Sequence, residues 1–146
     1  MHINLSVEGL ERFVDAQGPV YAQVLDELSL GRKETHWIWF IFPQLKALGR
    51  SAMAKHFGLE SKAEALAYWQ HPVLAQRLVE CTRLLLEQPD SDVFEIFGSP
   101  DDLKFRSCMT LFHQVAPQEA VFQQALLRFF HGKPDEATLA LLKQQA

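Results

Sequence analysis

The run Lys33-Glu34-Thr35-His36-Trp37-Ile38-Trp39-Phe40-Ile41-Phe42-Pro43-Gln44 is the part of this chain that most constrains its fold. It holds two of the three tryptophans and two of the eleven phenylalanines. Each aromatic side chain removes roughly 150–250 Å² from solvent when it is buried, so the run can anchor a hydrophobic core. The same run carries Lys33, His36 and Gln44, whose polar groups need partners close to that core. This mixture indicates either a ligand pocket or a core crossed by polar contacts.

The composition of the whole chain is that of an ordinary folded domain. Hydrophobic residues make up 48% and charged residues 22% of the 146 residues, enough for a core without disulfides or metal. The net charge of −4 argues against a nucleic-acid partner. The longest apolar run, residues 37–42, is too short to span a membrane, and the N-terminus lacks a secretory signal. The two cysteines, Cys81 and Cys108, are expected to be buried reduced thiols. We therefore expect a cytoplasmic protein with no membrane partner, and the sequence does not indicate its oligomeric state.

Helical periodicity and capping signals recur along residues 1–146 and predict a single all-α domain of about eight or nine helices. Ser61 with Glu64, and Ser99 with Asp102, are start signals of the capping-box kind. The expected helices cover residues 8–17, 19–30, 51–57, 61–70, 72–88, 91–97 (capped by Ser91 or Asp90), 100–115, 117–131 and 134–142. The aromatic run fits a buried strand or a compact helix, and its helical surroundings favour a helix that ends before Pro43.

The polar residues of the aromatic run form the first half of a candidate site. Lys33 and His36 would lie one turn apart on a helix, so both could point into one cavity. Lys33 would bind an anion, and His36 would be a donor or general base and is the candidate catalytic residue. Trp37 and Trp39 would form a wall for a nucleobase or another ring, with Gln44 as a further polar contact. The alternative is that His36 bonds a backbone carbonyl, the tryptophans belong to the core, and Lys33 extends to water.

The second half of the candidate site lies on the expected helix 100–115. Lys104, Ser107 and Thr110 follow one another at i+3 steps and are expected to share a drifting stripe beside the core face. With Lys33, this stripe would bind a phosphate or carboxylate. The alternative is a surface lysine near Asp101, with the hydroxyls bonding back to the preceding turn. Together the two segments predict a pocket for a small anionic, nucleotide-like ligand between residues 33–44 and 100–115.

The chain resembles a bacterial family of domains of unknown function, family 1810, sometimes labelled calpastatin-like. The resemblance rests on the run from Gly31 to Gln44 and extends over nearly the whole chain, through these further positions: Gly49, Ser51, His71-Pro72, Leu74, Arg77, Phe97-Gly98, Asp102, Lys104, Ser107, Met109-Thr110-Leu111-Phe112 and Thr138-Leu139. It implies a compact, mainly helical fold and no established activity. The sequence departs from the family at Cys108, where the family carries a second serine, so the resemblance gives that side chain no catalytic role.

Two other functions are compatible with the sequence. One is a non-catalytic interaction module, in which the polar insertions only fix helix packing. The other is a ribonuclease of the all-helical HEPN type, because Arg106 and His113 stand seven residues apart on one helical face, although the acidic net charge lacks a track for RNA. His71 is expected mainly as a helix cap, and Arg77 as a partner of Glu80 or an anion ligand. Histidine spacing and the lack of a glycine-rich phosphate loop predict neither a metal nor a cofactor.

Overall fold

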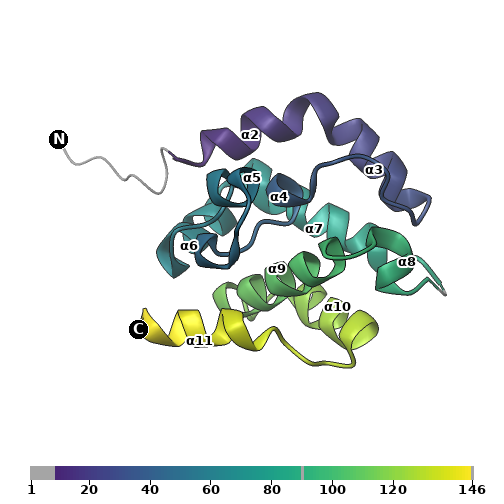
Figure 1. Cartoon of the computed structure of the whole chain (residues 1–146). Helices are drawn as coiled ribbons and strands as arrows, with labels where there is room; N and C mark the ends of the chain where they lie inside the picture. The colour runs from purple at the N-terminus through teal and green to yellow at the C-terminus, as the bar shows by residue number, and fades with distance from the viewer. Residues whose placement is uncertain (1–8, 90, 146) are drawn as a thin grey trace.

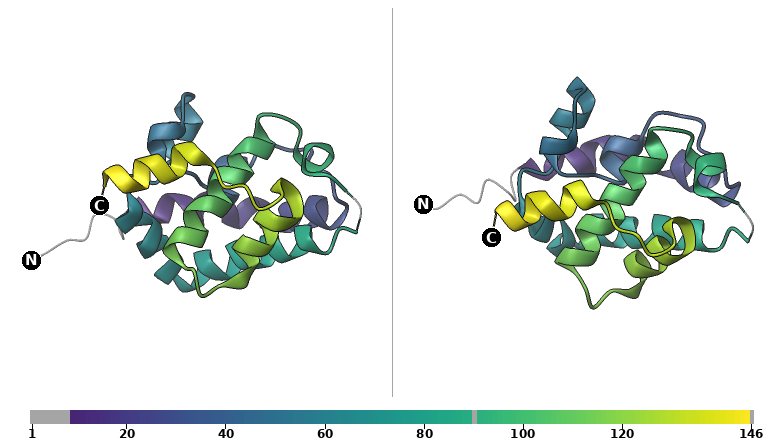
Figure 2. Two further views of the ribbon diagram at one scale, coloured as in Figure 1. Left: turned by 90° about the horizontal axis from the view of Figure 1, so that it is seen from below. Right: turned by 60° about the horizontal axis from the view of Figure 1, so that its bottom comes forward.

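Helix α9 (Asp101–Val115) lies in the middle of the computed structural model, which describes residues 9–89 and 91–145. In Figure 1, α2 (Glu11–Gln17), α3 (Tyr21–Ser29) and α4 (Ile38–Ile41) lie above α9, and α10 (Ala120–Phe130) and α11 (Glu136–Gln144) lie below it. Four side chains on the core face of α9 are completely buried, as their helical spacing predicts: Phe105, Cys108, Met109 and Phe112. Figure 2 shows from two further directions that α11 lies beside α9 and that α5 projects from the rest of the chain.

Helices form nearly all of the regular structure before and after α9. Before it come α2 (Glu11–Gln17), α3 (Tyr21–Ser29), α4 (Ile38–Ile41), α5 (Ala52–His56), α6 (Lys62–Gln70), α7 (Pro72–Leu86) and α8 (Val93–Phe97), with 3₁₀ turns at Gly18–Val20 and Lys46–Leu48; after it come α10 (Ala120–Phe130) and α11 (Glu136–Gln144). Within the described ranges there is no strand, only an isolated parallel bridge between Leu45 and Leu59. The predicted all-α class is confirmed. The expected start of the first helix, near Glu8, lies outside the described residues.

Side-chain caps begin several helices where the sequence predicts them. The Ser51 hydroxyl accepts a hydrogen bond from the Ala54 N–H at 3.1 Å, and the Ser61 hydroxyl accepts one from the Glu64 N–H at 3.2 Å. Each cap satisfies an amide that has no partner inside its helix. Only half of the expected capping box forms, because the Glu64 carboxylate accepts the N–H of Glu60 instead of returning to Ser61.

Two other predicted caps are wrong. Pro100 occupies the N-cap position of α9 and no side chain caps that helix, so Ser99 does not have the expected role. Asp92, and not Ser91, caps α8, and its carboxylate accepts two of the free amides of the first turn. Asp90, the other expected cap, lies outside the described residues.

The aromatic run forms a helix of only four residues, α4, preceded by an irregular loop at residues 33–37. The type of element was predicted correctly and its length was not. Phe42, just after α4, packs edge-on against Phe97 and Phe105, with ring centroids at 6.0 and 4.9 Å. Phe97 and Phe105 stack on each other at 5.0 Å. This aromatic cluster fixes the run against α8 and α9, and so determines where its polar residues lie.

Both cysteines are buried free thiols, as expected. Burial raises the pKa of the Cys81 thiol to about 12 and that of Cys108 well above its ordinary value, so neither is a ready nucleophile near neutral pH. Among the helices of the described residues, none is both long enough and apolar enough to cross a membrane.

Candidate functional site

The buried carboxylate of Glu27, on α3, holds the loop that precedes α4. It accepts hydrogen bonds from the Thr35 hydroxyl at 2.6 Å, from the N–H groups of Thr35 and Glu34 at 3.0 and 2.7 Å, and from the Trp37 indole at 2.9 Å. Burial alone would raise the pKa of Glu27, but the hydrogen bonds, those of Thr35 foremost, favour the charged form and lower the pKa to about 2. These bonds tie residues 34, 35 and 37 to α3, and the segment 33–37 is an irregular loop.

Glu27 is a structural residue that the sequence analysis missed. A signal for it was present, because Glu27 lies between Val24 and Leu28 on the buried face of α3. A glutamate on an apolar helix face is rarely buried unless it is paired.

Lys33 and Lys104 meet at the carboxylate of Asp101. The ammonium of Lys33 lies 2.8 Å from Asp101 Oδ2, and that of Lys104 lies 3.8 Å from Oδ1. The Lys33 side chain is only 6% exposed, whereas that of Lys104 is 22% exposed. The ammonium groups also lie 5.1 and 5.5 Å from the ring centroids of Trp37 and Trp39, respectively. The structure therefore brings together the two predicted lysines, and it adds an acidic partner between them.

Lys104 also lines a small cavity with Trp39 and Gln44. The cavity has a volume of about 10 Å³, and its remaining walls are apolar side chains and backbone around α4 and α5. The indole nitrogen of Trp39 is buried, and within the described part of the chain it has no hydrogen-bond partner. An unpaired buried donor of this kind costs roughly 1–3 kcal/mol. We call Lys33, Trp39, Gln44, Asp101 and Lys104 the lysine cluster.

Trp37 differs from Trp39, although the two were predicted to form one wall. Trp37 is 1% exposed, donates its indole N–H to Glu27, and packs against Phe42 and Phe97. Its ring is therefore part of the core and is not a surface for a ligand in this structure. The alternative expectation, a tryptophan of the core, describes Trp37, and a ligand contact of Trp37 stays a prediction.

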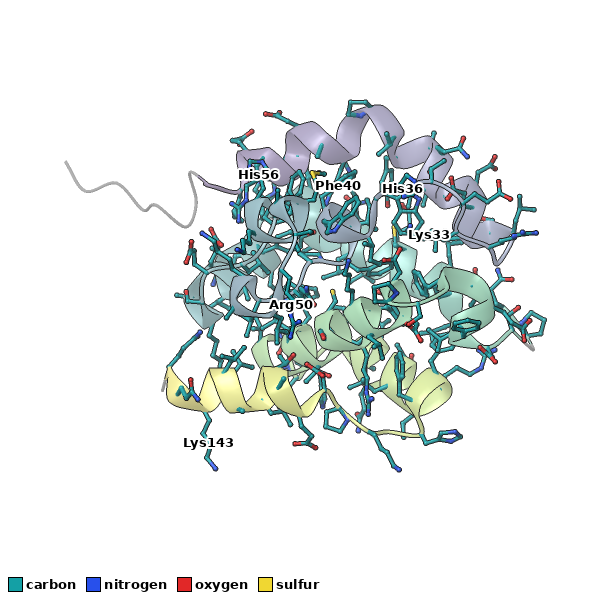
Figure 3. The ribbon with its side chains drawn as sticks, in the orientation of Figure 1. Lys33, His36, Phe40, Arg50, His56 and Lys143 are labelled. Atoms are coloured by element: carbon teal, nitrogen blue, oxygen red, sulfur yellow. The ribbon has the colours of Figure 1, made fainter. Side chains whose placement is uncertain are left out.

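His36 lies on the exposed part of the loop before α4. Figure 3 shows His36 and Lys33 in the segment between α3 and α4. The expectation that they lie one helical turn apart is wrong, because residues 33–36 are not helical. No hydrogen bond or ion pair of the His36 side chain occurs among the residues described. The geometry thus gives the candidate catalytic residue no partner that would tune it as an acid or a base.

Ser107 and Thr110 bond at the beginning of α11, away from the lysine cluster. The Ser107 hydroxyl bonds to the Leu103 carbonyl and to Asp135 Oδ2, each at 3.1 Å. The Thr110 hydroxyl donates to the Arg106 carbonyl and accepts the N–H of Asp135, each at 2.9 Å. Lys104, Ser107 and Thr110 therefore do not share one face of α9. Six residues of an α-helix amount to a net rotation of about 240°, so Thr110 points about 120° away from Lys104 measured the shorter way round. Both hydroxyls thus bond to the carbonyl of the preceding turn, as the alternative expectation states.

Arg106 and His113 do not form an arranged catalytic pair. The Arg106 guanidinium donates to the Lys133 carbonyl at 2.9 Å and lies over the Phe130 ring, so it fixes the connection between α10 and α11. The Nδ1 atom of His113 is buried, without a hydrogen-bond partner among the described residues. No contact between the two side chains supports the ribonuclease alternative.

His71 caps α7, as expected: its Nδ1 accepts the N–H groups of Val73 and Leu74 at 3.3 and 3.4 Å. The expected ion pair of Arg77 with Glu80 does not form among the described residues, and its alternative role as an anion ligand stays a prediction. Arg77 instead donates to the Gln17 side chain at 3.2 Å.

Gln17 is a second buried polar residue that the sequence analysis missed. Its amide donates to the Phe40 carbonyl at 2.7 Å and to the Tyr68 hydroxyl at 3.2 Å. The link joins α2 to the end of the aromatic run. A polar residue on the last turn of a short helix gives no sequence signal for so distant a contact.

The comparisons with known proteins agree with this helical architecture and add no activity. Among the residues described, no three His, Cys, Asp or Glu side chains gather as metal ligands. A comparison with curated proteins finds no match. The crystal structure of the conserved hypothetical protein Rv1873 from Mycobacterium tuberculosis is similar, with 48% identity and a TM-score of 0.90 over 92% of this chain and 96% of that one. The family described as "Protein of unknown function (DUF1810)" matches residues 7–142. Because that match covers nearly the whole chain, this protein belongs to the DUF1810 family.

Proposed function

We propose that this protein binds a small anionic ligand at the lysine cluster. Two observations on one residue carry the proposal: the buried indole N–H of Trp39 has no partner among the described residues, and Trp39 lines a cavity together with Lys104 and Gln44. Buried donors in folded proteins nearly always have a partner, so a donor without one suggests a group that is supplied from outside. A ligand oxygen would accept this N–H.

The charges of the cluster support an anion. Lys33 and Lys104 share the single carboxylate of Asp101, which leaves one positive charge unmatched within these ion pairs. Cations in a partly buried, aromatic environment are poorly hydrated, so an additional anion is stabilised there more than at an open surface. Lys104 is the residue that reaches such an anion, because Lys33 is buried against Asp101.

The size of the cavity limits what enters it. A volume of about 10 Å³ accommodates about one water molecule, hence one ligand oxygen. A carboxylate or phosphate would place one oxygen beside Trp39 and Gln44, and its remaining oxygens near the partly exposed ammonium of Lys104. The proposal is one of binding and includes no reaction. His36 lies on the exposed loop and has no role in it.

Titration calorimetry with acetate, citrate, inorganic phosphate and adenosine monophosphate tests the proposal. At least one of these anions is expected to bind, and Lys104→Ala is expected to weaken that binding about tenfold or more, since a charge-assisted contact contributes roughly 1.5–3 kcal/mol. Lys143→Ala is the matched control, because Lys143 is an exposed lysine on α11 (Figure 3). Equal affinities of Lys104→Ala and the unmodified protein for every anion that binds would remove Lys104 from the site.

A further inference from the structure

Asp101 is the carboxylate of the lysine cluster, and its two ion pairs are unequal. Its Oδ2 lies 2.8 Å from the Lys33 ammonium, which is hydrogen-bonding distance, whereas its Oδ1 lies 3.8 Å from the Lys104 ammonium, which is not. Asp101 therefore neutralises mainly the buried Lys33. No hydrogen bond of the Lys104 ammonium occurs among the described residues, so its N–H groups are available to a ligand.

An anion that binds Lys104 also lies close to Asp101. A ligand oxygen about 2.8 Å from the Lys104 ammonium is no farther than about 7 Å from Asp101 Oδ1, because that ammonium is itself 3.8 Å from Oδ1. Charges in water are screened over roughly 8–10 Å at ordinary salt concentrations, and partly buried charges are screened less. Asp101 therefore repels every negative charge that the ligand brings.

The charge of the cluster limits the charge of its ligand. Lys33, Lys104 and Asp101 together carry one positive charge. A singly charged anion makes the site neutral, whereas a doubly charged anion leaves a net negative charge beside Asp101. Attraction to the cluster grows in proportion to the charge of the ligand, but the hydration free energy lost on burial grows with the square of that charge. The balance therefore favours the singly charged anion.

The donors of the cluster suit a group with two oxygens. One oxygen fills the cavity of about 10 Å³ and accepts the Trp39 N–H, and a second oxygen accepts a hydrogen bond from Lys104. A carboxylate has two oxygens and one charge. A phosphate monoester carries roughly 1.5 to 2 charges near neutral pH and three free oxygens. It brings a second charge for which the cluster has no further cation.

We infer, on the basis of the proposed anion site, that Asp101 makes the lysine cluster selective for singly charged carboxylates over doubly charged phosphate monoesters. Asp101 is a specificity-determining residue in two ways. It neutralises Lys33, so that only the charge of Lys104 is left for the ligand, and it repels a second negative charge at that position.

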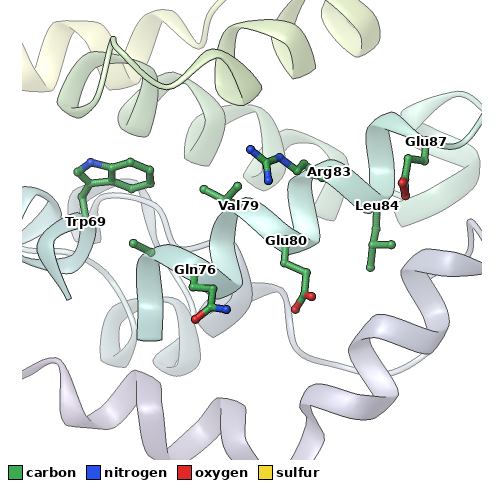
Figure 4. Close-up of a pocket in the computed structure, with 8 residues that line it drawn as sticks. Trp69, Gln76, Val79, Glu80, Arg83, Leu84 and Glu87 are labelled. Carbon is green, nitrogen blue, oxygen red and sulfur yellow. The ribbon is translucent and has the colours of Figure 1, made fainter. Parts of the chain in front are cut away.

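The larger hollow along α7 is a poor site for an anion. It has a volume of about 550 Å³ and is lined by the carboxylates of Glu80 and Glu87 (Figure 4). Its described lining residues include one cation, Arg83, whose guanidinium lies 3.7 Å from the Glu119 carboxylate. In Figure 4, Arg83 and Glu80 extend from different sides of α7 and do not converge on one point. Binding of small anions is therefore expected to report on the lysine cluster.

The experiment is titration calorimetry of the full chain at pH 8 with acetate, methyl phosphate and dimethyl phosphate. Acetate and dimethyl phosphate carry one negative charge at this pH, and methyl phosphate carries two. Acetate is expected to bind about tenfold more tightly than methyl phosphate or better. Dimethyl phosphate is also expected to bind more tightly than methyl phosphate, which separates the effect of charge from the chemistry of phosphorus.

Variants test whether Asp101 is the selective residue. Asp101→Asn adds one positive charge to the cluster, so it is expected to increase the affinity for methyl phosphate about tenfold more than that for acetate. Asp15→Asn, at an exposed position of α2, changes the net charge equally and is expected to leave the ratio of the two affinities unchanged. Lys104→Ala is expected to weaken the binding of all three anions. Circular dichroism shows whether each variant is folded, and the comparison of anions on the unmodified protein needs no variant.

Three results would overturn the inference. Methyl phosphate that binds the unmodified protein as tightly as acetate would remove the selectivity and leave the proposed anion site standing. An equal gain in affinity for both anions in Asp101→Asn would show that this carboxylate does not select between them. Binding of none of the three anions would remove the proposed site and the inference together.

Discussion

The lysine cluster and the beginning of α11 lie on different sides of the same helix, α9. They differ in how completely their polar groups are paired. Around α11, the carboxylate of Asp135 accepts hydrogen bonds from Ser107 and from both the N–H and the hydroxyl of Thr138, and Thr110 accepts the Asp135 N–H. In the lysine cluster, two ammonium groups share Asp101, and the Trp39 N–H has no partner within residues 9–89 and 91–145. The difference between the two regions is that the polar groups at α11 satisfy one another, whereas those of the lysine cluster leave a donor and a positive charge for another group.

The largest expected effect concerns Glu27, which holds the loop that brings Lys33 to the cluster. Its pKa is lowered from 4.5 to about 2 in the folded protein. A lowered folded-state pKa means that this stabilisation is complete above about pH 4.5 and is lost as the pH falls toward 2. The free energy of unfolding should therefore fall by about 3 kcal/mol over that range because of Glu27. Urea unfolding between pH 6 and pH 2 measures this loss, and Glu27→Gln should show a correspondingly smaller pH dependence.

The second prediction concerns Asp101 and distinguishes an anion-binding lysine cluster from an ion pair that only stabilises the fold. Asp101→Asn leaves Lys33 buried without its carboxylate, and the free energy of unfolding should decrease by about 2 kcal/mol. The same change removes the competing anion from both lysines, so the affinity for the anions that bind should increase. Chemical unfolding and titration calorimetry measure the two effects. A variant that is destabilised and also binds anions more weakly would contradict the assigned role of Asp101.

The third prediction concerns Asp135, at the beginning of α11. Asp135→Ala removes the N-cap of α11 and leaves the Thr138 N–H and hydroxyl without their acceptor, so the free energy of unfolding should decrease by about 1.5 kcal/mol. Anion affinity should not change, because the partners of the Asp135 carboxylate are two hydroxyls and a backbone N–H, and none of them is a cation that could bind an anion. A loss of anion binding in a folded Asp135→Ala protein would show that the two regions belong to one site after all.

The smallest effect is expected at Trp39. Trp39→Phe removes the unpaired indole N–H, which favours folding, and also removes packing area of the larger ring, which opposes it. The two effects offset each other, so the free energy of unfolding should change by less than about 0.5 kcal/mol. Trp37→Phe is the matched control: it removes a donor to Glu27 and should cost about 2 kcal/mol. Equal costs for the two variants, measured by urea unfolding, would mean that the Trp39 N–H has a partner, and the main support for the anion site would be lost.

Part of the fold and part of the site were predictable from local signals. Ser51, Ser61 and His71 cap helices where the sequence places them, since a cap needs only its own backbone within three residues. The buried stripe of α9 was predictable from periodicity. Of the candidate site, Lys33, Trp39, Gln44 and Lys104 come together and Trp37 contacts Lys33 from the core, whereas Ser107 and Thr110 bond elsewhere and His36 lies on the exposed loop. The failures have two causes. Residues 33–36 were expected to be helical, and the stripe on α9 was expected to drift less than the roughly 120° that separates Thr110 from Lys104.

The sequence by itself determined the all-α class, most helix limits and the buried aromatic core, because periodicity and capping act over one or two turns. Only the tertiary structure decided that Glu27 would hold the loop before α4, that Asp101 would lie between two lysines, and that Ser107 and Thr110 would bond at α11. Each of these contacts joins residues that no short spacing connects. A polar side chain takes the partner that packing brings within about 3 Å, and packing is a property of the whole chain.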